Sequence, residues 1–485
     1  MDIVSLIEKL TKEILSAEEM FLKDPKDFCT LETSVKSSTE AFAAECLGAV
    51  LSDLNRAIYE SGWRKRRYVV QRQDKRRLIC SVGDITFDST YYCSKDGKSG
   101  FTHLVEDVIE LGKDERFSEV AEAMMLHEAG KTSYEEAAKI LPSKQKITKT
   151  TVMNKVHGLA EELPDIIYEE PKTVPYLFIE ADEDHVAEQH GRSGDSKENK
   201  SFISKLIYVY ENKQDSGEAK GRKELVNVSY FGGVYPGPDG NRKLWEKVQR
   251  FVECNYNSDE LKKVFISGDG AQWIKSGTNY FDNAVFCADK YHLMQYINAA
   301  AGQMLDEKDN VKEELWHMLY SKSKGAKSRF DSYTEQMMKS AKRPEVIEQL
   351  RTYVLGNWRA VRRTLRDKQV NGCSAESHVS HVLSARLSSR PMGWSQTGAD
   401  RMSKLRCYMK NSGSEKIIDF VRYSRKQRHL AATGTETPAP KALKIRDIIA
   451  ENYDQTRSYI ERIQAHFPDG TAKKSAAIRE MLWGL

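Results

Sequence analysis

Three acidic residues of this chain stand where predicted strands end. Asp182 follows the apolar run LFIEA, Asp269 follows VFISG, and Asp289 follows AVFCA. Carboxylates at the ends of neighbouring strands can converge in the crevice where α/β sheets place their ligands. Hard divalent cations prefer such oxygen ligands. The pattern therefore predicts a divalent-metal site, although each aspartate taken singly could instead form a turn or cap a helix.

The elements that must position these acids are predicted to form a mixed sheet. Three strand-like runs come first and helix and strand signals then alternate, which favours a mixed α/β architecture with helices on its faces. The predicted strands are residues 176–181, 202–210, 226–231, 263–268 and 283–288, and the predicted helix is 242–252. We assign residues 163–302 to the first part of this domain.

Composition limits the class of protein. The 485 residues suit about three domains, and 40% apolar residues allow sizeable cores. No apolar run reaches the roughly 18 residues of a membrane span, so we expect no membrane contact. The eight cysteines contain no CxxC pair, which argues against a disulfide framework and a cysteine zinc site. The N-terminus reads as an amphipathic helix with acids throughout, and we expect a cytoplasmic protein.

The N-terminal third is predicted to hold two helical regions around a small sheet. Residues 1–60 read as a helical arm, 61–102 as a small basic β region and 103–162 as a helical domain. Within the last, Ser133 and Glu136 form a capping box before a short helix. The polar helix that follows completes the pattern of a helix-turn-helix. Its candidate DNA-contacting residues are Lys149, Asn154 and Lys155.

Basic residues are clustered although the net charge is only +4. The stretch 63–77 interleaves cations with aromatic residues, which suits contacts to phosphates. Its candidate DNA-binding residues are Arg64, Lys65, Arg66, Arg67, Lys75, Arg76 and Arg77. A second run, 357–368, repeats this character on a predicted helix. The alternative for each run is a solvated face.

The C-terminal half is predicted to be almost entirely helical. Residues 303–372 show no strand signal and read as a helical insertion. Residues 373–423 supply the last helices of the core, and 424–485 have the composition of a linker followed by helices.

Four runs of the sequence resemble bacterial insertion-sequence transposases of the ISLre type, a group also catalogued as an uncharacterised protein family. They are residues 179–186, 266–274, 289–292 and 372–394. The resemblance spans roughly residues 60–415, and the last run is the most specific. It implies an RNase H-like catalytic domain of the DDE class, distantly similar to Mutator-type transposases, with a helical insertion before the third acid.

The resemblance also implies roles for individual residues. Asp182 matches the aspartate of the first strand, Asp269 the one that ends the fourth strand, and Glu376 the helical glutamate. Asp289 and His292 resemble the Asp-x-x-His signature and would support the site. Glu376 lies near the start of a helix that Ser374 could cap, so an acid there is favoured by the helix dipole alone. Asp400 is a rival for the third position.

The expected function is that of a metal-dependent DNA transposase. Two Mg²⁺ or Mn²⁺ ions would serve an in-line phosphodiester displacement, with Asp182 bridging both and Asp269 and Glu376 each completing one side. The partners would be double-stranded DNA, namely terminal inverted repeats and target, and further copies of the chain in a homo-oligomer. The alternatives are a catalytically inactive DNA-binding protein derived from a transposase, and an RNase H-like nuclease without strand transfer.

Overall fold

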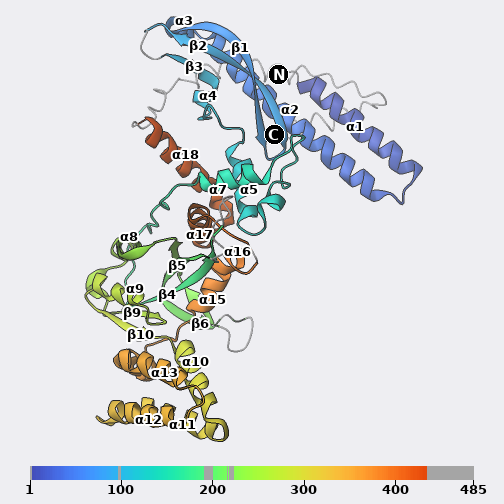
Figure 1. The fold of residues 1–485 in the computed structure, drawn as a ribbon. Coiled ribbons are helices and arrows are strands. Elements are labelled where there is room, and N and C mark those ends of the chain that lie inside the picture. The colour runs from blue at the N-terminus through green and yellow to red at the C-terminus, as the bar shows by residue number, and fades with distance from the viewer. Residues whose placement is uncertain are drawn as a thin grey trace. The chain divides into compact units, whose positions relative to one another are not determined.

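The computed structural model describes residues 3–96, 100–189, 200–215, 217, 223–390 and 392–433. The chain divides into two compact units (Figure 1). Unit 1 comprises residues 1–125, 138–148 and 429–485, and unit 2 comprises residues 126–137 and 149–428. Each unit has hydrophobic clusters of its own. Within the described residues, no helix has the length and apolar character needed to span a bilayer.

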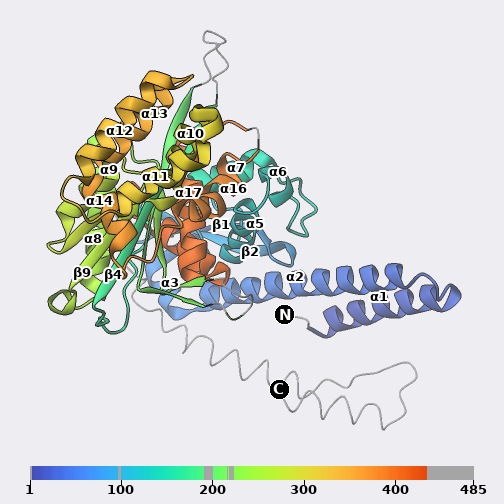
Figure 2. The same ribbon diagram turned by 90° about the horizontal axis from the view of Figure 1, so that it is seen from below.

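Unit 1 combines a pair of long helices with a small antiparallel sheet. The helices α1 and α2 lie side by side (Figure 2), and Asp27 caps α2 by accepting from the Thr30 amide at 3.1 Å. These helices agree with the predicted helical arm. The elements are α1 (Ile3–Lys23), α2 (Phe28–Glu60), α3 (Gly62–Arg67), β1 (Tyr68–Cys80), β2 (Gly83–Ser94), β3 (Phe101–His103) and α4 (Leu104–Val108).

The helix α2 packs directly on β2. Asn55 exchanges two hydrogen bonds of 3.0 Å with Thr90, one to its hydroxyl and one from its amide. Gly48 lies so close to the strand that an added Cβ would come within 2.7 Å of the Thr86 carbonyl oxygen. The predicted basic β region 61–102 opens with the short helix α3, which Ser61 caps by accepting from the Arg64 amide at 3.2 Å.

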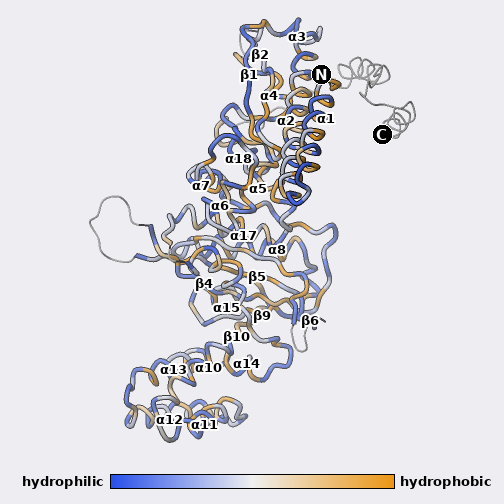
Figure 3. Tube along the Cα trace, turned by 90° about the vertical axis from the view of Figure 1, so that its right-hand side faces the viewer, coloured by the Kyte–Doolittle hydropathy of each residue, from blue (hydrophilic) through white to orange (hydrophobic). Residues whose placement is uncertain are grey.

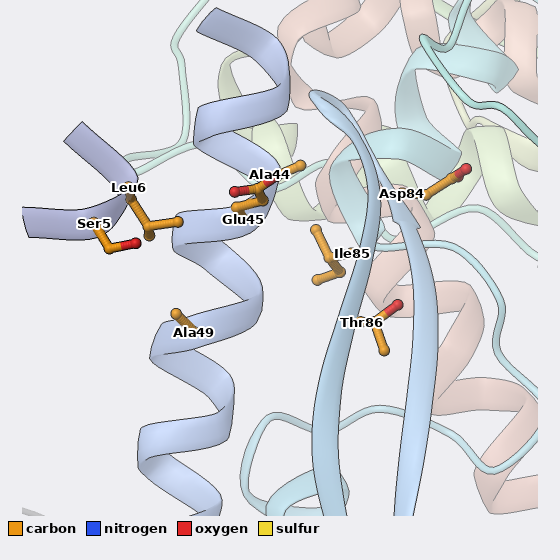
Figure 4. A pocket seen from close by; sticks show the side chains of 8 residues that line it. All are labelled: Ser5, Leu6, Ala44, Glu45, Ala49, Asp84, Ile85 and Thr86. Carbon is orange, nitrogen blue, oxygen red and sulfur yellow. The ribbon is translucent and has the colours of Figure 1, made fainter. Parts of the chain in front are cut away.

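A pocket of about 430 Å³ lies between α1, α2 and β2 (Figure 4). Its two carboxylates already have partners. Glu45 accepts a hydrogen bond from Lys9, and Asp84 accepts from the Ser143 hydroxyl at 2.6 Å and the Lys144 amide at 3.0 Å. The pocket therefore offers no free acidic ligand.

The predicted helix-turn-helix is matched only in part. The helices are α5 (Glu119–Ala129), α6 (Tyr134–Ala137) and α7 (Lys149–His157). The Ser133 hydroxyl accepts from the Glu136 amide at 3.1 Å, which confirms the predicted N-cap. However, α6 ends after a single turn, and residues 138–148 form a connection longer than the three or four residues of a helix-turn-helix.

Unit 2 contains the predicted mixed sheet. Its strand order is β10-β9-β4-β5-β8, in which β4 runs antiparallel to β5 and parallel to β9. The apolar stretches of these strands appear in orange in Figure 3. The strands are β4 (Tyr176–Ala187), β5 (Ser201–Tyr210), β8 (Ser229–Gly233), β9 (Lys263–Gly268) and β10 (Ala284–Ala288).

Two local features differ from the sequence-based prediction. The strand β4 continues to Ala187, so Asp182 lies inside the strand and not beyond its end. Ten residues of β4 pair with β5, and the acidic residues 182–184 are among them, so they remain in the strand conformation. The segment between the predicted strands 202–210 and 226–231 contains a two-stranded ribbon, β6 (Asn212–Asp215) with β7 (Lys223–Val226).

Helices cover both faces of the sheet. On one face, apolar side chains of β4 and β9 pack against α8 (Gly237–Asn255) and α9 (Gln272–Lys275). The other face is covered by α15 (Ala375–Val379), a π-helical turn (Ser380–Ser384), α16 (Ala385–Leu387) and α17 (Gln396–Ser412). Short 3-10 turns occupy Ser258–Glu260, Ser276–Tyr280, Gly302–Glu307 and Ser414–Lys416.

The helical insertion begins earlier than the predicted residue 303. The helix α10 (Lys290–Ala301) directly follows β10, and its Leu293 and Ile297 belong to the core of the insertion. Figure 1 shows these helices gathered beyond β10. The others are α11 (Lys308–Tyr320), α12 (Ala326–Ser340), α13 (Pro344–Gly356) and α14 (Trp358–Arg366).

The predicted linker at 424 is wrong in its first part. The helix α18 (Ile417–Thr433) continues through this point because it is anchored there. Phe420 and Val421 are buried, and the Ser424 hydroxyl accepts from the Ala160 amide at 3.0 Å. The remainder of the predicted linker and the C-terminal helices lie outside the described residues.

Candidate active site

The register of the central strands brings Asp182 and Asp269 near each other. The parallel ladder between β4 and β9 pairs Glu180 with Ser267. Asp182 lies two residues further along β4, and Asp269 is the first residue after β9. The charge of Asp269 contributes to the raised pKa of Asp182, so the two carboxylates lie near each other. The register therefore brings both acids to the place where the pairing of β4 with β9 ends.

The third strand adds Asp289 to this edge. Ala288 of β10 pairs with Gly268 of β9, and the Asp289 amide donates to the Gly268 carbonyl at 2.9 Å. Asp289 is buried and caps α10 by accepting from the Tyr291 amide at 2.9 Å. Its second oxygen lies 2.7 Å from His292 Nδ1. Asp289 thus both begins the helix and orients the histidine.

Burial and neighbouring charges perturb the titration of this cluster. Burial raises the pKa of Asp182 to about 6, and the charges of Asp269 and Glu183 act in the same direction. The hydrogen bond to Asp289 raises the pKa of His292, to which the charges of Asp182 and Asp269 contribute. A raised aspartate pKa and a raised histidine pKa are both expected where carboxylates are crowded and partly buried, because such a site disfavours further negative charge and stabilises a cation.

Glycines allow the loop that carries Asp269 to pass close to its neighbours. An added Cβ on Gly268 would lie 2.7 Å from the Ala181 carbonyl oxygen. Gly270 has φ +99°, a conformation that favours glycine. Asp269 stabilises the turn by accepting from the Ala271 amide at 2.8 Å. The turn-forming alternative therefore holds for one oxygen of Asp269, and its other oxygen makes no hydrogen bond within the described residues.

A buried glutamate that the sequence analysis did not single out lies two residues before Asp182. Glu180 is 1% exposed and accepts hydrogen bonds from the hydroxyls of Tyr208 and Tyr210 and from Lys213 at 3.2 Å. It also accepts from the Ser374 amide at 2.6 Å. An acidic residue within an otherwise apolar strand was the available signal, because a buried carboxylate requires several donors.

Glu180 and a second acid of β4 anchor the helical segment that carries Glu376. Ser374, just before α15, binds Glu180, and the Ser388 hydroxyl, just after α16, donates to Asp184 at 2.8 Å. Glu180 and Asp184 flank Asp182 on the same face of β4. Residues 374–388 therefore run across the face that holds Asp182, with a π-helical turn in between.

Glu376 lies exposed in the first turn of α15. The side chain of Ser374 does not cap this helix as predicted, because its amide and hydroxyl are engaged by Glu180. No interaction between Glu376 and Asp182 or Asp269 is present in the described part of the chain. The structure thus brings together Asp182, Asp269, Asp289 and His292 and leaves Glu376 on the neighbouring segment.

Asp400 is fully engaged in holding α17 to β8. One oxygen accepts from the Val234 amide at 3.0 Å, and the other binds Lys404 at 2.9 Å and also Arg401. Asp400 and Lys404 are 8% and 3% exposed. Both oxygens of this rival acid are therefore committed to partners within the fold.

The donor set fits a divalent cation in part. Asp182 and Asp269 provide oxygen ligands of the kind that Mg²⁺ prefers, and the burial that raises the pKa of Asp182 favours a cation beside it. Among the described residues, no group of three or more His, Cys, Asp or Glu side chains is placed to hold a metal ion. His378 and His381 do not form one, since His378 bonds to the Tyr230 hydroxyl at 2.9 Å and His381 is exposed.

Two of the predicted DNA-binding cations serve the fold of unit 1. Arg64 is buried and donates to the Tyr59 carbonyl at 2.9 Å. Arg76 donates to the carbonyls of Lys113 at 2.9 Å and Glu115 at 2.6 Å. The remaining cations of the cluster are exposed: Lys65, Arg66, Arg67, Lys75 and Arg77.

The candidates on α7 are mostly accessible. Lys149 and Asn154 are exposed, whereas Lys155 is half-buried. The opposite side of α7 is held by Val152 and Val156, which are fully buried. The helix therefore presents its N-terminal lysine and Asn154 to solvent.

Comparison with known proteins identifies relatives over most of the chain. The sequence profile described as an uncharacterised protein family, UPF0236, matches residues 22–425. A UPF0236 protein of Caldanaerobacter subterraneus subsp. tengcongensis, whose name joins several gene designations, is 34% identical over 84% of this chain and 84% of its own length. A UPF0236 protein in the vanSb 3′ region of Streptococcus gallolyticus is 23% identical over 80% of this chain and 84% of its own.

The comparison with solved structures also found matches. The Drosophila P element transposase strand transfer complex covers 72% of this chain and 96% of that chain, with 14% sequence identity and a TM-score of 0.22. A score this low supports no statement about fold or function.

Proposed function

This chain belongs to the uncharacterised protein family UPF0236, and we propose from its candidate site that it is a DNA transposase of the DDE class. The observation that carries the proposal is the proximity of Asp182 and Asp269 at the place where the pairing of β4 with β9 ends. The name of one relative joins several gene designations. Multiple copies of one sequence are what an insertion sequence leaves in a genome, so this name agrees with the proposal.

The sheet supports assignment of unit 2 to the RNase H-like class. Three antiparallel strands, β4, β5 and β8, lie on one side of the sheet, and β9 and β10 run parallel to β4 on the other. A helical insertion follows the last strand and precedes the helix that carries Glu376. This is the arrangement that the resemblance to ISLre-type transposases implies.

Asp182 and Asp269 would hold two Mg²⁺ or Mn²⁺ ions, with Glu376 as the third ligand. Such ions, when bound, activate the attacking oxygen and stabilise the leaving oxygen of an in-line displacement. Asp289 orients His292 beside the two aspartates. Glu180 holds the start of α15 and thereby limits where Glu376 can reach.

The rival functions differ in chemistry and in partners. A nuclease of the same class would cut but not join strands, and a degenerate transposase would bind DNA without cutting. The presence of both Asp182 and Asp269, close enough for their charges to interact, favours an active enzyme. Transposition requires two DNA ends to be held together, so we propose a homo-oligomer on the DNA.

The proposal predicts metal-dependent cleavage and joining. A duplex that carries one end of the element should be cut in Mg²⁺ or Mn²⁺, and excess chelator should stop cutting without releasing the DNA. A pre-cut end with a target plasmid measures joining. Undiminished cleavage in chelator would contradict the two-metal account, and cleavage without joining would identify a nuclease.

The exposed cations of unit 1 are predicted to contact DNA phosphates. Each neutralised phosphate contributes about −0.9 to the slope of log K against log salt. Replacing Lys65, Arg66, Lys75 and Arg77 by glutamine should therefore flatten the slope by about 3–4. Filter binding across a salt series measures this change.

A matched control removes four exposed lysines from α1, α2 and the turn between them. The quadruple variant at Lys12, Lys23, Lys26 and Lys36 loses four positive charges, as many as the variant in the basic cluster. Its slope should change by less than about 1. Equal effects of the two quadruple variants would assign the basic cluster to a solvated face.

A further inference from the structure

A second pocket, of about 400 Å³, lies between the sheet and the helical insertion of unit 2. Its wall includes Lys275 at the end of α9, Lys327 in the first turn of α12, and Arg359 and Arg363 on α14. The two arginines are four residues apart and share one face of that helix. Four cations from three separate elements thus converge on one cavity.

These cations have no acidic partners in the described structure. No carboxylate lines the pocket, and none of the four forms an ion pair with a described residue. Arg363 donates to the Phe286 carbonyl, and the Lys275 ammonium lies 5.9 Å from the Phe286 ring. Like charges that line one cavity repel each other unless an anion occupies it. The basic run 357–368 of the sequence accounts for two of the four.

The pocket adjoins the loop that carries Asp269. Asn357 lines the pocket, and its side chain packs against Gly270. A Cβ added at Gly270 would lie 3.2 Å from Asn357 Nδ2. Lys275 ends the short helix that begins three residues after Asp269. An anion held in the pocket would therefore lie near the loop that carries Asp269, on the side of the sheet covered by α9.

We propose that this pocket binds a backbone phosphate of the DNA strand that enters the candidate active site. The inference rests on the proposed function and assigns the substrate contact nearest to its acids. Arginine and lysine side chains are the donors that most often contact phosphodiester oxygens. Because Lys275 lies on α9, which packs on the sheet, and the other three cations lie in the insertion, a bound strand would bridge the two.

The test compares two triple variants of the full chain. The pocket variant is Lys275→Gln, Lys327→Gln and Arg359→Gln, and it spares Arg363, which bonds to the backbone. The control variant is Lys308→Gln, Lys324→Gln and Lys342→Gln, which removes three lysines of the insertion that do not line the pocket. Thermal unfolding of both should match the unsubstituted chain.

The probe is a duplex that carries one end of the element and its flanking DNA. We expect the pocket variant to flatten the salt slope of binding by about 2–3, against less than about 1 for the control. Phosphate-ethylation interference should lose its signal next to the cleavage position only in the pocket variant. Equal slopes and equal interference patterns in the two variants would overturn the proposal.

Two further arms separate the remaining explanations. Inorganic phosphate and pyrophosphate are titrated calorimetrically at constant ionic strength. Tight binding that depends on the three cations, with DNA binding unchanged, would identify a small-anion site and overturn the proposal. If the chain never cleaves in Mn²⁺ yet the slopes still differ, the transposase function fails and the DNA contact stands.

Discussion

Replacing Asp182 by asparagine is expected to abolish metal-dependent cleavage and to leave the fold at least as stable as before. The substitution removes the ligand expected to be shared by both ions, and each ~1.4 kcal/mol of lost transition-state stabilisation is tenfold in rate. A loss of several kcal/mol therefore lowers cleavage by about three orders of magnitude or more. Single-turnover cleavage of a pre-bound element end measures this loss.

The stability of the same variant distinguishes a site residue from a structural one. The pKa of Asp182 is about 6 in the folded chain and 3.8 for an ordinary aspartate, so its charge opposes folding at pH 7. Removing that charge should raise the free energy of unfolding by roughly 1–3 kcal/mol without metal. Mg²⁺ should then stabilise the unsubstituted chain and not the variant.

Asp184→Asn is the matched control. Asp184 lies on the same face of β4, and burial also raises its pKa, but its partner is Ser388. We expect this variant to keep most cleavage. Loss of cleavage in both variants, or normal cleavage by Asp182→Asn, would contradict the role given to Asp182.

Replacing Glu376 by glutamine is expected to lower cleavage by orders of magnitude while folding and DNA binding persist. Glu376 is exposed, so a neutral isostere disturbs little of the fold. If it supplies the third ligand, its loss removes several kcal/mol of transition-state stabilisation. Cleavage and unfolding are measured on the same preparations, with Asp269→Asn as an inactive control.

Asp400→Asn should show the opposite pattern. It leaves buried Lys404 without its carboxylate, and breaking a buried pair typically costs about 3–5 kcal/mol. We expect a lower unfolding temperature and, well below it, most of the cleavage rate. If Asp400→Asn were stable and inactive while Glu376→Gln cleaved normally, the third acid would be Asp400.

Local patterns were sufficient for much of the secondary structure. Alternating and continuous apolar runs predicted the five strands of the mixed sheet, and helical periodicity predicted the N-terminal helices. The spacing of Ser133 and Glu136 predicted a real N-cap. These features depend on residues within a few positions of each other, which is why sequence alone could locate them.

The placement of the candidate acids depended on pairing between distant segments. The sequence placed Asp182 after a strand, but the long ladder with β5 keeps it inside β4, and the pairing of β4 with β9 brings it near Asp269. The capping signal likewise predicted where α6 begins but not that it ends after a single turn, because a cap depends only on the first residues of a helix.

The charge of a residue alone predicted neither its hydrogen-bond partners nor its exposure to solvent. Arg64 and Arg76 looked equivalent to their neighbours in the sequence, yet backbone carbonyls from other segments bind both guanidinium groups. Glu180 was passed over, although four donors from distant positions surround it. The sequence by itself determined which residue types were available and which elements carried them. Strand register and burial decided which of these residues came close to one another, because both arise from contacts between segments far apart in the chain.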